Sequence, residues 1–371
     1  MAYNTITFKH GTNATISADG TKLCCESNGK SSEFLRKTFE HGDEQTNLNH
    51  NYAFICDISD VENPKITHVF NNARSIVMNH DSTIVGVIEE YPYPEKGAKY
   101  KILGLRDGNY NILKEYEMPH KKQRRYEEYG FCEHKCSHNG RTHAVRCYTH
   151  SETAFVISLD YDSVRFIEIH DSYTKSYRIS QLVVSESVLV IVTAETGAGL
   201  KKKVTRYSYN KLFTSEDQDI SGDQGDELWK ETDLYFDLIA VKRNGFILTH
   251  GEAISVHNKD MSLVHELRIP KLLTTVKNQP VDVKTAVDDS VVFIFYKSGF
   301  IIAYSPTENK ILYTMDPLTS DKVLYKYDMK YDGYEKAKDE FYESKKTHFS
   351  MTPLGRMVVY SGPHNTFINY V

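Results

Sequence analysis

The chain has 371 residues, of which 40% are hydrophobic and 26% are charged, a composition typical of a folded globular protein rather than a disordered one. Its formal net charge of −5 argues against a protein built to bind duplex nucleic acid, because such proteins are usually strongly basic. The 26 tyrosines and 17 phenylalanines favour pleated, half-buried surfaces, and helical periodicity is scarce, so the sequence predicts an all-β fold.

The first predicted element is an alternating strand at residues 4–9, which has no partner of its own nearby in the sequence. From residue 15 onward one pattern recurs, consisting of a short apolar strand, a tight polar turn and a second apolar strand. Asp-Gly and Asn-Gly pairs at several of these turns supply the positive φ angles that tight hairpins require. The seven predicted turns lie near residues 20, 81, 140, 187, 245, 289 and 355.

In each repeat a second predicted hairpin follows the turn. Its two strands are clearest in four repeats, where they are 52–57 with 66–70, 154–159 with 164–169, 253–256 with 263–269, and 300–304 with 310–314. Four short strands per repeat is the plan of a β-propeller blade. The last repeat lacks a fourth strand after residues 366–371. We therefore predict a seven-bladed β-propeller whose ring is closed when the N-terminal strand pairs with the C-terminal blade, because this pairing satisfies an otherwise bare edge. Two unrelated all-β domains are the alternative.

This phasing, with phrases such as Ile16-Ser-Ala-Asp-Gly-Thr-Lys-Leu23, resembles the WD-repeat propeller superfamily across the whole chain. The sequence departs from that family because it contains no Trp-Asp and no Gly-His dipeptide, so no functional residue can be carried over. The resemblance implies a degenerate member, with residues 1–371 forming a single propeller domain. It also implies a rigid platform for partner proteins.

Function usually resides on the loops that a rigid frame presents, and four insertions stand out, at about residues 26–50, 119–128, 200–228 and 318–347. The first is predicted to hold a short helix folded onto its own blade. The last is dense in tyrosine and has helical spacing over 333–345. Exposed aromatic residues suit a binding surface, although the segment could instead pack against the ring. The candidate partner-binding residues are Tyr325, Tyr327, Tyr331, Tyr334, Phe341 and Tyr342.

Two basic runs could bind RNA or a phosphate ligand if they lie on one face, and the alternative is that both are merely solvated. The first run is followed at once by Glu127 and Glu128, and the second lies in strand-like sequence. The candidate residues are Lys121, Lys122, Arg124, Arg125, Lys201, Lys202, Lys203 and Arg206.

Two segments carry metal-ligand residue types at unsuitable spacing. In residues 132–138 two Cys and two His alternate along one predicted innermost strand, which cannot bring all four side chains to a zinc ion. The segment that begins at Asp217 opens like a calcium loop, but Leu228 occupies the position of the final carboxylate, so we interpret the acidic stretch 216–227 as a mobile loop. No metal or other cofactor is predicted.

No nucleophile elbow, phosphate-cradling glycine loop or His-Glu-x-x-His helix occurs. The predicted function is therefore a non-enzymatic protein–protein interaction platform, a scaffold or adaptor subunit of an intracellular complex. RNA or phosphate-ligand binding is the alternative, and an enzyme with its site in the central channel of the propeller is a lesser one. Because no secretory signal or membrane span is evident and the six cysteines form no disulfide framework, the predicted location is the cytoplasm, the nucleus or both.

Overall fold

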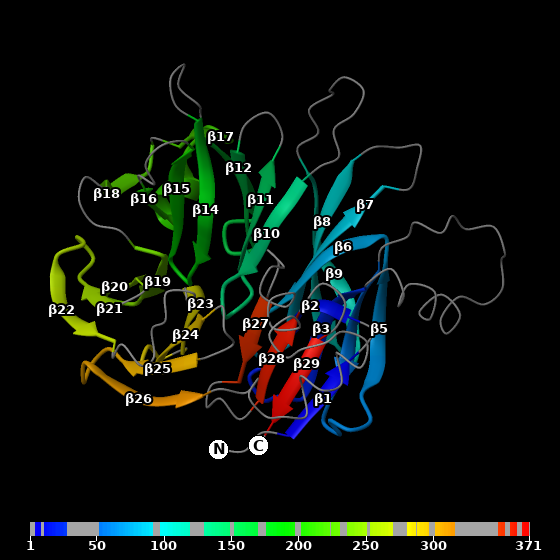
Figure 1. Cartoon of the computed structure of the whole chain (residues 1–371). Coiled ribbons are helices and arrows are strands. Elements are labelled where there is room, and N and C mark those ends of the chain that lie inside the picture. Colours follow the sequence, from blue (N-terminus) through cyan, green and yellow to red (C-terminus); the bar gives the residue numbers. More distant parts are fainter. Residues whose placement is uncertain are drawn as a thin grey trace. The chain divides into compact units, whose positions relative to one another are not determined.

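The computed structural model describes residues 4–8, 11–27, 52–91, 97–118, 130–148, 152–169, 176–196, 202–222, 224–230, 236–250, 253–269, 280–286, 288–296, 301–315, 348–352, 357–361 and 366–370. The chain divides into two compact units, one from residues 1–118, 295–302 and 313–371, the other from residues 119–294 and 303–312. The described elements are β-strands with one short helix (Figure 1), which confirms the predicted all-β class.

Two sheets of the first unit are antiparallel and follow the chain order of their strands, so each is a simple meander. One contains β2 (Gly11–Ile16), β3 (Lys22–Ser27), β4 (Tyr52–Asp57) and β5 (Lys65–Asn71). The next contains β6 (Ala73–Met78), β7 (Ile84–Glu90), β8 (Ala98–Arg106) and β9 (Asn109–Glu117). The central strands are the most buried, because both of their faces meet neighbouring apolar side chains. In β4 the first five of six residues, Tyr-Ala-Phe-Ile-Cys, are buried.

The third sheet of the first unit joins the two ends of the chain. Its order is β1 (Asn4–Phe8), β29 (Thr366–Tyr370), β28 (Met357–Ser361) and β27 (His348–Met351). β1 and β29 run antiparallel with Asn4 facing Tyr370 and Phe8 facing Thr366, so the two labelled strands lie side by side in Figure 1. The predicted pairing of the N-terminal strand with the C-terminal repeat is therefore confirmed. The count of seven blades and the closure of a ring stay predictions.

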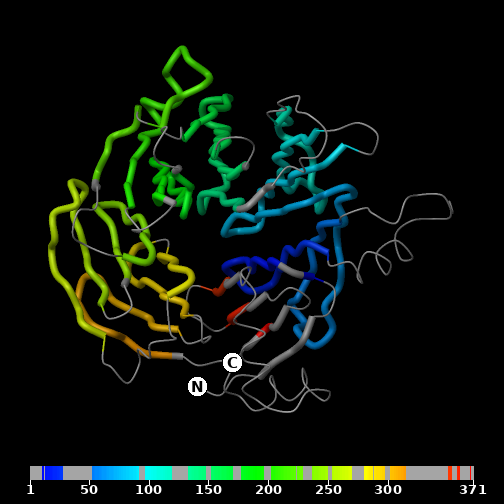
Figure 2. Tube along the Cα trace, turned by 45° about the horizontal axis from the view of Figure 1, so that its top comes forward, coloured from blue at the N-terminus to red at the C-terminus, as the bar shows by residue number. Residues whose placement is uncertain are grey.

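The second unit contains three further sheets, and Figure 2 follows their strands from green to yellow. They are built from β10 (Gly130–Cys136), β11 (Thr142–Tyr148), β12 (Glu152–Ser158), β13 (Ser163–Ile169) and β17 (Asp219–Ser221); from β14 (Ser176–Val184), β15 (Val188–Thr196), β16 (Lys202–Ser208) and β18 (Asp226–Lys230); and from β19 (Leu238–Lys242), β20 (Gly245–His250), β21 (Ala253–His257) and β22 (Leu263–Arg268). A last meander contains β23 (Pro280–Thr285), β24 (Val292–Tyr296), β25 (Ile301–Ser305) and β26 (Lys310–Met315).

The acidic stretch 216–227 is not the mobile loop that its composition suggested. Residues Asp219–Ser221 form β17, which pairs in parallel with β13, and Asp226–Lys230 form β18, which completes the sheet of β14–β16. The helix α2 (Tyr209–Thr214) connects β16 to this stretch and buries Tyr209, Leu212 and Phe213 in the core that β13 and β15 share. Pairing with two existing sheet edges outweighs the low strand propensity of the acidic sequence.

One six-residue turn recurs between the first and second strands of four sheets. The backbone N–H of its first residue donates to the carbonyl five residues later, at 2.8–2.9 Å, and the side chain of its third residue accepts from the N–H two residues on, at 2.9–3.1 Å. Its fourth residue has φ between 60° and 74° in all four copies, which explains the glycines at two of these positions. The copies are residues 17–22, 79–84, 137–142 and 286–291.

Neighbouring turns are also bonded to each other. In the first unit the N–H of Ala18 donates to the carbonyl of His80 at 2.8 Å. In the second unit the N–H of Asn139 donates to a carboxylate oxygen of Glu186 at 3.2 Å, and that of Arg243 to a carboxylate oxygen of Asp289 at 2.6 Å. Each bond links the turn of one sheet to the turn of the next sheet in the chain, so these turns hold successive sheets together.

Candidate functional site

The first strands of successive sheets in the second unit are bonded through side chains that follow a β-bulge. The bulge at Cys132 precedes Glu133 of β10, whose carboxylate accepts from the backbone N–H of Leu182 on β14 at 3.2 Å. A bulge at Ser180 precedes Gln181 of β14, whose amide pairs with the backbone N–H and carbonyl of Ile239 on β19 at 3.0 and 2.8 Å. A bulge re-aims the side chain beside it, so both residues reach the otherwise bare edge of the next first strand.

Two pairs of oppositely charged side chains, one on β10 and one on β23, are half-buried in the second unit and act on one another through their charges. Lys135 faces Glu133, and Lys284 faces Asp282, with 3.7 Å between the ammonium nitrogen and the carboxylate oxygen in each pair. We call Glu133, Lys135, Asp282 and Lys284 the first-strand charge cluster. The Cys and His residues of 132–138 draw attention to zinc and away from this cluster, whose sequence signal is an acid and a lysine two residues apart in both strands.

The pKa values within this cluster respond to shared burial and to each other's charge. Burial raises the pKa of Glu133, against the opposing field of Lys135. For Lys135 burial works against the charge, but the fields of Asp282 and Glu133 outweigh it, so its pKa is raised. Burial lowers the pKa of Lys284, and the like charge of Lys135 adds to that effect. The β10 and β23 lysines therefore act on one another electrostatically.

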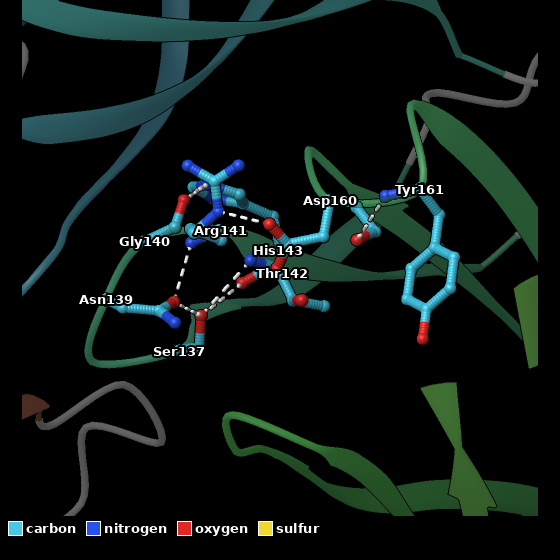
Figure 3. Close-up of polar contacts among 9 residues, drawn as sticks. Ser137, Asn139, Gly140, Arg141, Thr142, His143, Asp160 and Tyr161 are labelled. Atoms are coloured by element: carbon cyan, nitrogen blue, oxygen red, sulfur yellow. Dashed lines mark hydrogen bonds and ion pairs between the residues drawn. The ribbon is translucent and has the colours of Figure 1, made fainter. Parts of the chain in front are cut away.

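The turn at residues 137–142 is drawn in Figure 3 with the residues that brace it. Ser137 Oγ donates to the amide oxygen of Asn139 at 2.8 Å, and that oxygen also accepts from the N–H of Arg141 at 2.9 Å. The guanidinium Nε of Arg141 donates to the carboxylate of Asp160 in the next hairpin. These contacts fix the turn and tie it to the next hairpin.

Immediately after this turn His143 is fully buried, and its Nε2 donates to the carbonyl of Gly140 at 2.8 Å, since a carbonyl can only accept. Burial lowers the pKa of His143 to about 4. The ring is therefore neutral at pH 7 and serves as a fixed hydrogen-bond donor.

We expect His143 to make the protein less stable as the pH falls from 6.5 to 4. Its pKa is about 4 in the folded state against an ordinary value of 6.5, so below pH 6.5 the unfolded state binds a proton that the folded state does not. Above pH 6.5 both states are neutral and the effect vanishes. At pH 5 the loss amounts to about 2 kcal/mol. Urea denaturation at pH 7.5 and pH 5.0 measures it.

The control for that experiment is His143→Gln, which keeps an N–H donor for Gly140 and does not titrate. Wild type should lose about 2 kcal/mol more than the variant between the two pH values. Equal losses would show that the pKa of His143 is the same in the folded and the unfolded state.

The outermost strand β9 of the first unit exposes two adjacent apolar side chains, Ile112 and Leu113, with 55% and 48% of their surface accessible. The register shift opposite Ile102 and Leu103 makes Leu113 a bulged residue, which lies over Gly104, where an added Cβ would come within 2.9 Å of the leucine. Beside them is a hollow of about 850 Å³, with Ile84 and Leu105 among its lining residues. We call Ile112, Leu113 and this hollow the β9 surface.

The three candidate phosphate-binding residues that the structure describes are each engaged within the chain. Lys202 donates to the carbonyls of Phe236 and Asp237 at 2.6 and 3.0 Å. Lys203 pairs with Glu227 at 3.0 Å, and Arg206 with Asp226 at 3.2 Å. The acidic strand β18 therefore neutralises the basic strand β16 beside it, a contact that the sequence analysis did not anticipate.

The remaining candidate residues, and the first insertion beyond Ser27, lie outside the described residues. This applies to the predicted helices within 26–50 and 333–345, and to Lys121, Lys122, Arg124, Arg125, Lys201, Tyr325, Tyr327, Tyr331, Tyr334, Phe341 and Tyr342. Among the residues that the structure does describe, no group of three or more His, Cys, Asp and Glu side chains is placed to hold a metal ion. Within the same part of the chain no helix is long and apolar enough to cross a membrane.

Known structures resemble this chain over almost its whole length. The β-propeller domain of Cps50 (Swd1) from Myceliophteria thermophila aligns with 99% of this chain and 98% of its own at a TM-score of 0.53 and 8% identity. The C-terminal WD40 domain of Sif2 aligns with 100% of this chain and 98% of its own at a TM-score of 0.49 and 8% identity. No family model matches the sequence, and no curated protein matches it. The likeness to the Cps50 (Swd1) domain shows that the chain has a β-propeller fold, as the phasing of its turns predicted.

Proposed function

We propose that this propeller is a non-enzymatic platform that binds protein partners in an intracellular complex, in the cytoplasm, the nucleus or both. The observation that carries the proposal is the β9 surface, where two adjacent apolar side chains lie exposed on an edge strand beside a hollow. Exposed apolar groups gathered on a rigid frame are typical of binding surfaces rather than of solvated ones. The cysteines that the structure describes are free thiols, which supports a reducing compartment.

The geometry of β9 favours a protein as the ligand. It is the last strand in the order β6-β7-β8-β9, and an edge strand offers backbone N–H and carbonyl groups to an added strand. The apolar pair Ile112 and Leu113 supplies an anchor of the kind that dominates binding energy in such contacts. We further propose that residues 1–371 act as one propeller domain and that the tyrosine-rich insertion at 318–347 adds to the partner surface.

The test compares partners bound by wild type with those bound by Ile112→Ser combined with Leu113→Ser. We expect a stoichiometric partner in a gentle affinity purification of wild type, and about tenfold weaker binding of that purified partner to the double variant in titration calorimetry. The control is Leu263→Ser combined with Val264→Ser, which removes an equally exposed apolar pair, at 57% and 50%, from the outer strand β22. Replacing 318–347 by a Gly-Ser linker tests the insertion.

Two outcomes would contradict this proposal. Absence of any stoichiometric partner under gentle conditions would count against a platform altogether. Equal partner binding by all three proteins, with the melting temperature unchanged, would show that β9 is not the binding surface.

RNA or phosphate-ligand binding through the basic runs is a weaker proposal, because Lys202, Lys203 and Arg206 are already engaged by carbonyls and carboxylates. An RNA ligand would have to displace these partners, and its binding would weaken steeply with salt. A gel-shift assay at low salt that shows no complex would exclude it. An enzyme centred on the channel stays the least favoured proposal.

A further inference from the structure

Four residues of β9 turn their backbone N–H and carbonyl groups away from β8, toward the open side of the sheet. The N–H of Leu105 on β8 donates to the carbonyl of Thr83 beside β7 at 2.7 Å, so Leu105 and the facing Tyr110 of β9 form a pair without hydrogen bonds between them. At the other end the N–H of Met118 donates to the carbonyl of Ala98 at 2.9 Å, so the residue before Met118 faces away. The residues so oriented are Tyr110, Ile112, Glu115 and Glu117. Within the part of the chain that the structure describes, their N–H groups have no hydrogen-bond partner.

β9 is also a long edge strand. It has nine residues, whereas the outer strands β5, β13, β18, β22 and β26 have five to seven. At about 3.3 Å per residue it is about 30 Å long. Long regular edges act as templates for another strand, which is why proteins keep them short, interrupt them with proline or cover them. β9 contains no proline and therefore offers more backbone to a binding partner than these other outer strands.

Another sheet of the chain already carries a strand added in this way. β17 pairs in parallel with the outer strand β13, where the N–H of Phe166 donates to the carbonyl of Gln218 at 3.0 Å. The N–H of Gly222 donates to the carbonyl of Glu168 at 2.8 Å. Between them Ile220 is 5% exposed and belongs to the core that β13 and β15 share. A short segment with one apolar residue between polar ones is thus sufficient to extend a sheet of this chain by a fifth strand.

The two exposed apolar side chains of β9 lie on opposite faces of the sheet. Leu113 lies over Gly104, beside the hollow, where an added Cβ would come within 2.9 Å of the leucine. Ile112 faces Leu103, and adjacent residues of a strand such as Leu103 and Gly104 point to opposite faces. A strand added to β9 alternates in the same way, so two successive apolar residues can cover Ile112 and Leu113 together. One apolar residue at every second position would cover only one of them.

An ion-pair network continues along the face that carries Ile112. Its members are Glu89, Glu115, Glu117, Lys99, Lys101 and the hydroxyl of Tyr91. Three carboxylates share two ammonium groups, so one negative charge is left over. Glu117 is the most exposed of the three, with 66% of its side chain accessible, and the ammonium nitrogen of Lys99 lies 3.5 Å from its carboxylate oxygen. A cation added beside Glu117 is therefore favoured, although an exposed ion pair contributes little.

We propose that a partner protein binds this chain by adding an extended segment to β9 as a fifth strand of its sheet, in parallel as β17 does on β13. This mode of binding rests on the proposed function and gives the β9 surface a ligand of stated form and chemistry. Two successive residues of the segment, level with Asn111 and Ile112, are apolar, and the residue level with Glu117 is basic. β8 covers the distance from Ile112 to Glu117 between Leu103 and Lys99, so the basic residue follows the second apolar one by about four positions.

The probe is the peptide acetyl-Thr-Thr-Leu-Ile-Thr-Gln-Thr-Arg-Thr-amide, which carries this pattern and is titrated into the full chain by calorimetry. We expect saturable binding with a Kd on the order of 0.1 mM. Replacing Leu-Ile by Ser-Ser in the peptide should weaken binding about tenfold, and replacing Arg by Glu about threefold. The same residues in reverse order fit only an antiparallel strand and should bind about tenfold more weakly.

Two variants separate backbone pairing from side-chain contact. Glu117→Pro removes the N–H that faces away from β8, a change that edge strands tolerate, whereas Glu117→Ala removes only the side chain. Both lose the carboxylate, so we expect the peptide to bind Glu117→Pro about tenfold more weakly than Glu117→Ala. Ile112→Ser combined with Leu113→Ser should weaken binding about tenfold. Leu263→Ser combined with Val264→Ser on β22 should leave it unchanged.

Amide hydrogen exchange followed by NMR reports the pairing directly. When the peptide saturates the chain, exchange at Tyr110, Ile112, Glu115 and Glu117 should slow by about tenfold or more, because their N–H groups then donate to the added strand. Exchange at Tyr116, whose N–H turns toward β8, should not change.

Any of four results would overturn strand addition. They are no peptide binding by wild type, equal binding of the reversed peptide, equal binding by Glu117→Pro and Glu117→Ala, and unchanged exchange at the four amides. The proposed function is tested separately by the purified partner. A partner that requires Ile112 and Leu113 but protects none of the four amides would leave β9 as the binding surface and exclude an added strand. The melting temperature of each variant without ligand shows that it is folded.

Discussion

Removal of residues 1–9 is expected to lower the free energy of unfolding by about 4 kcal/mol, because β1 supplies a full edge strand to the sheet of β27, β28 and β29. Five residue pairs face each other between Asn4–Phe8 and Thr366–Tyr370. Their loss also bares β29, whose Ile368 belongs to the same buried cluster as Val359 and the core of β2–β4. Urea denaturation of the truncated and full-length chains measures the change.

The matched control for this truncation is removal of residues 1–3 alone, which leaves β1 complete. That chain should unfold with the midpoint of the full-length protein. If the chain lacking residues 1–9 also keeps that midpoint, then β1 adds nothing to the fold and the proposed closure of the ring is wrong.

Substitution of Arg165 by Ala is expected to cost about 4 kcal/mol, because this buried guanidinium satisfies the carbonyls at the end of α2. It donates to Leu212 at 3.0 Å, and to Phe213 and Ser215 at 2.8 Å each. It also lies 5.8 Å from the ring centre of Phe213. Without it, carbonyls at the C-terminus of the helix lose their donor in the buried interior, and the positive charge that complements the helix dipole is lost.

Two further variants test this account of Arg165. Arg165→Lys should recover only part of the loss, because one ammonium group cannot reproduce the planar fork that spans three carbonyls. Lys211→Ala, at an exposed position of the same helix, should change stability by less than about 0.5 kcal/mol. A cost for Arg165→Ala no larger than that of Lys211→Ala would show that α2 holds its place without the guanidinium.

The strands and turns were predictable because they are encoded locally. Asp19-Gly20 and Asn139-Gly140 carry both the oxygen that accepts from the N–H two residues on and the glycine that adopts positive φ. Period-two alternation beside such turns is enough to place a hairpin. The pairing of β1 with β29 was predictable for another reason. The N-terminal strand has no partner nearby in the sequence, and the last repeat lacks a fourth strand.

The parts that sequence reasoning missed depend on contacts between distant residues. The helix α2 is only six residues long, and it is held by Arg165 from another hairpin, 47 residues before Leu212. β17 exists because β13 offers an edge, which its own acidic sequence does not reveal. Lys135 of β10 and Lys284 of β23 act on one another as like charges, and no local spacing in the sequence relates the two residues.

The bonds between neighbouring turns bear on how such a fold survives change in its sequence. In all three, the donor is a backbone N–H, which every residue but proline provides, while the acceptor is a backbone carbonyl at His80, a glutamate at position 186 and an aspartate at position 289. The hydrogen bond between neighbouring turns is therefore kept, although the residues that form it differ from copy to copy within one chain. A chain held together by such links can keep successive sheets in contact without a fixed residue type at the linking positions.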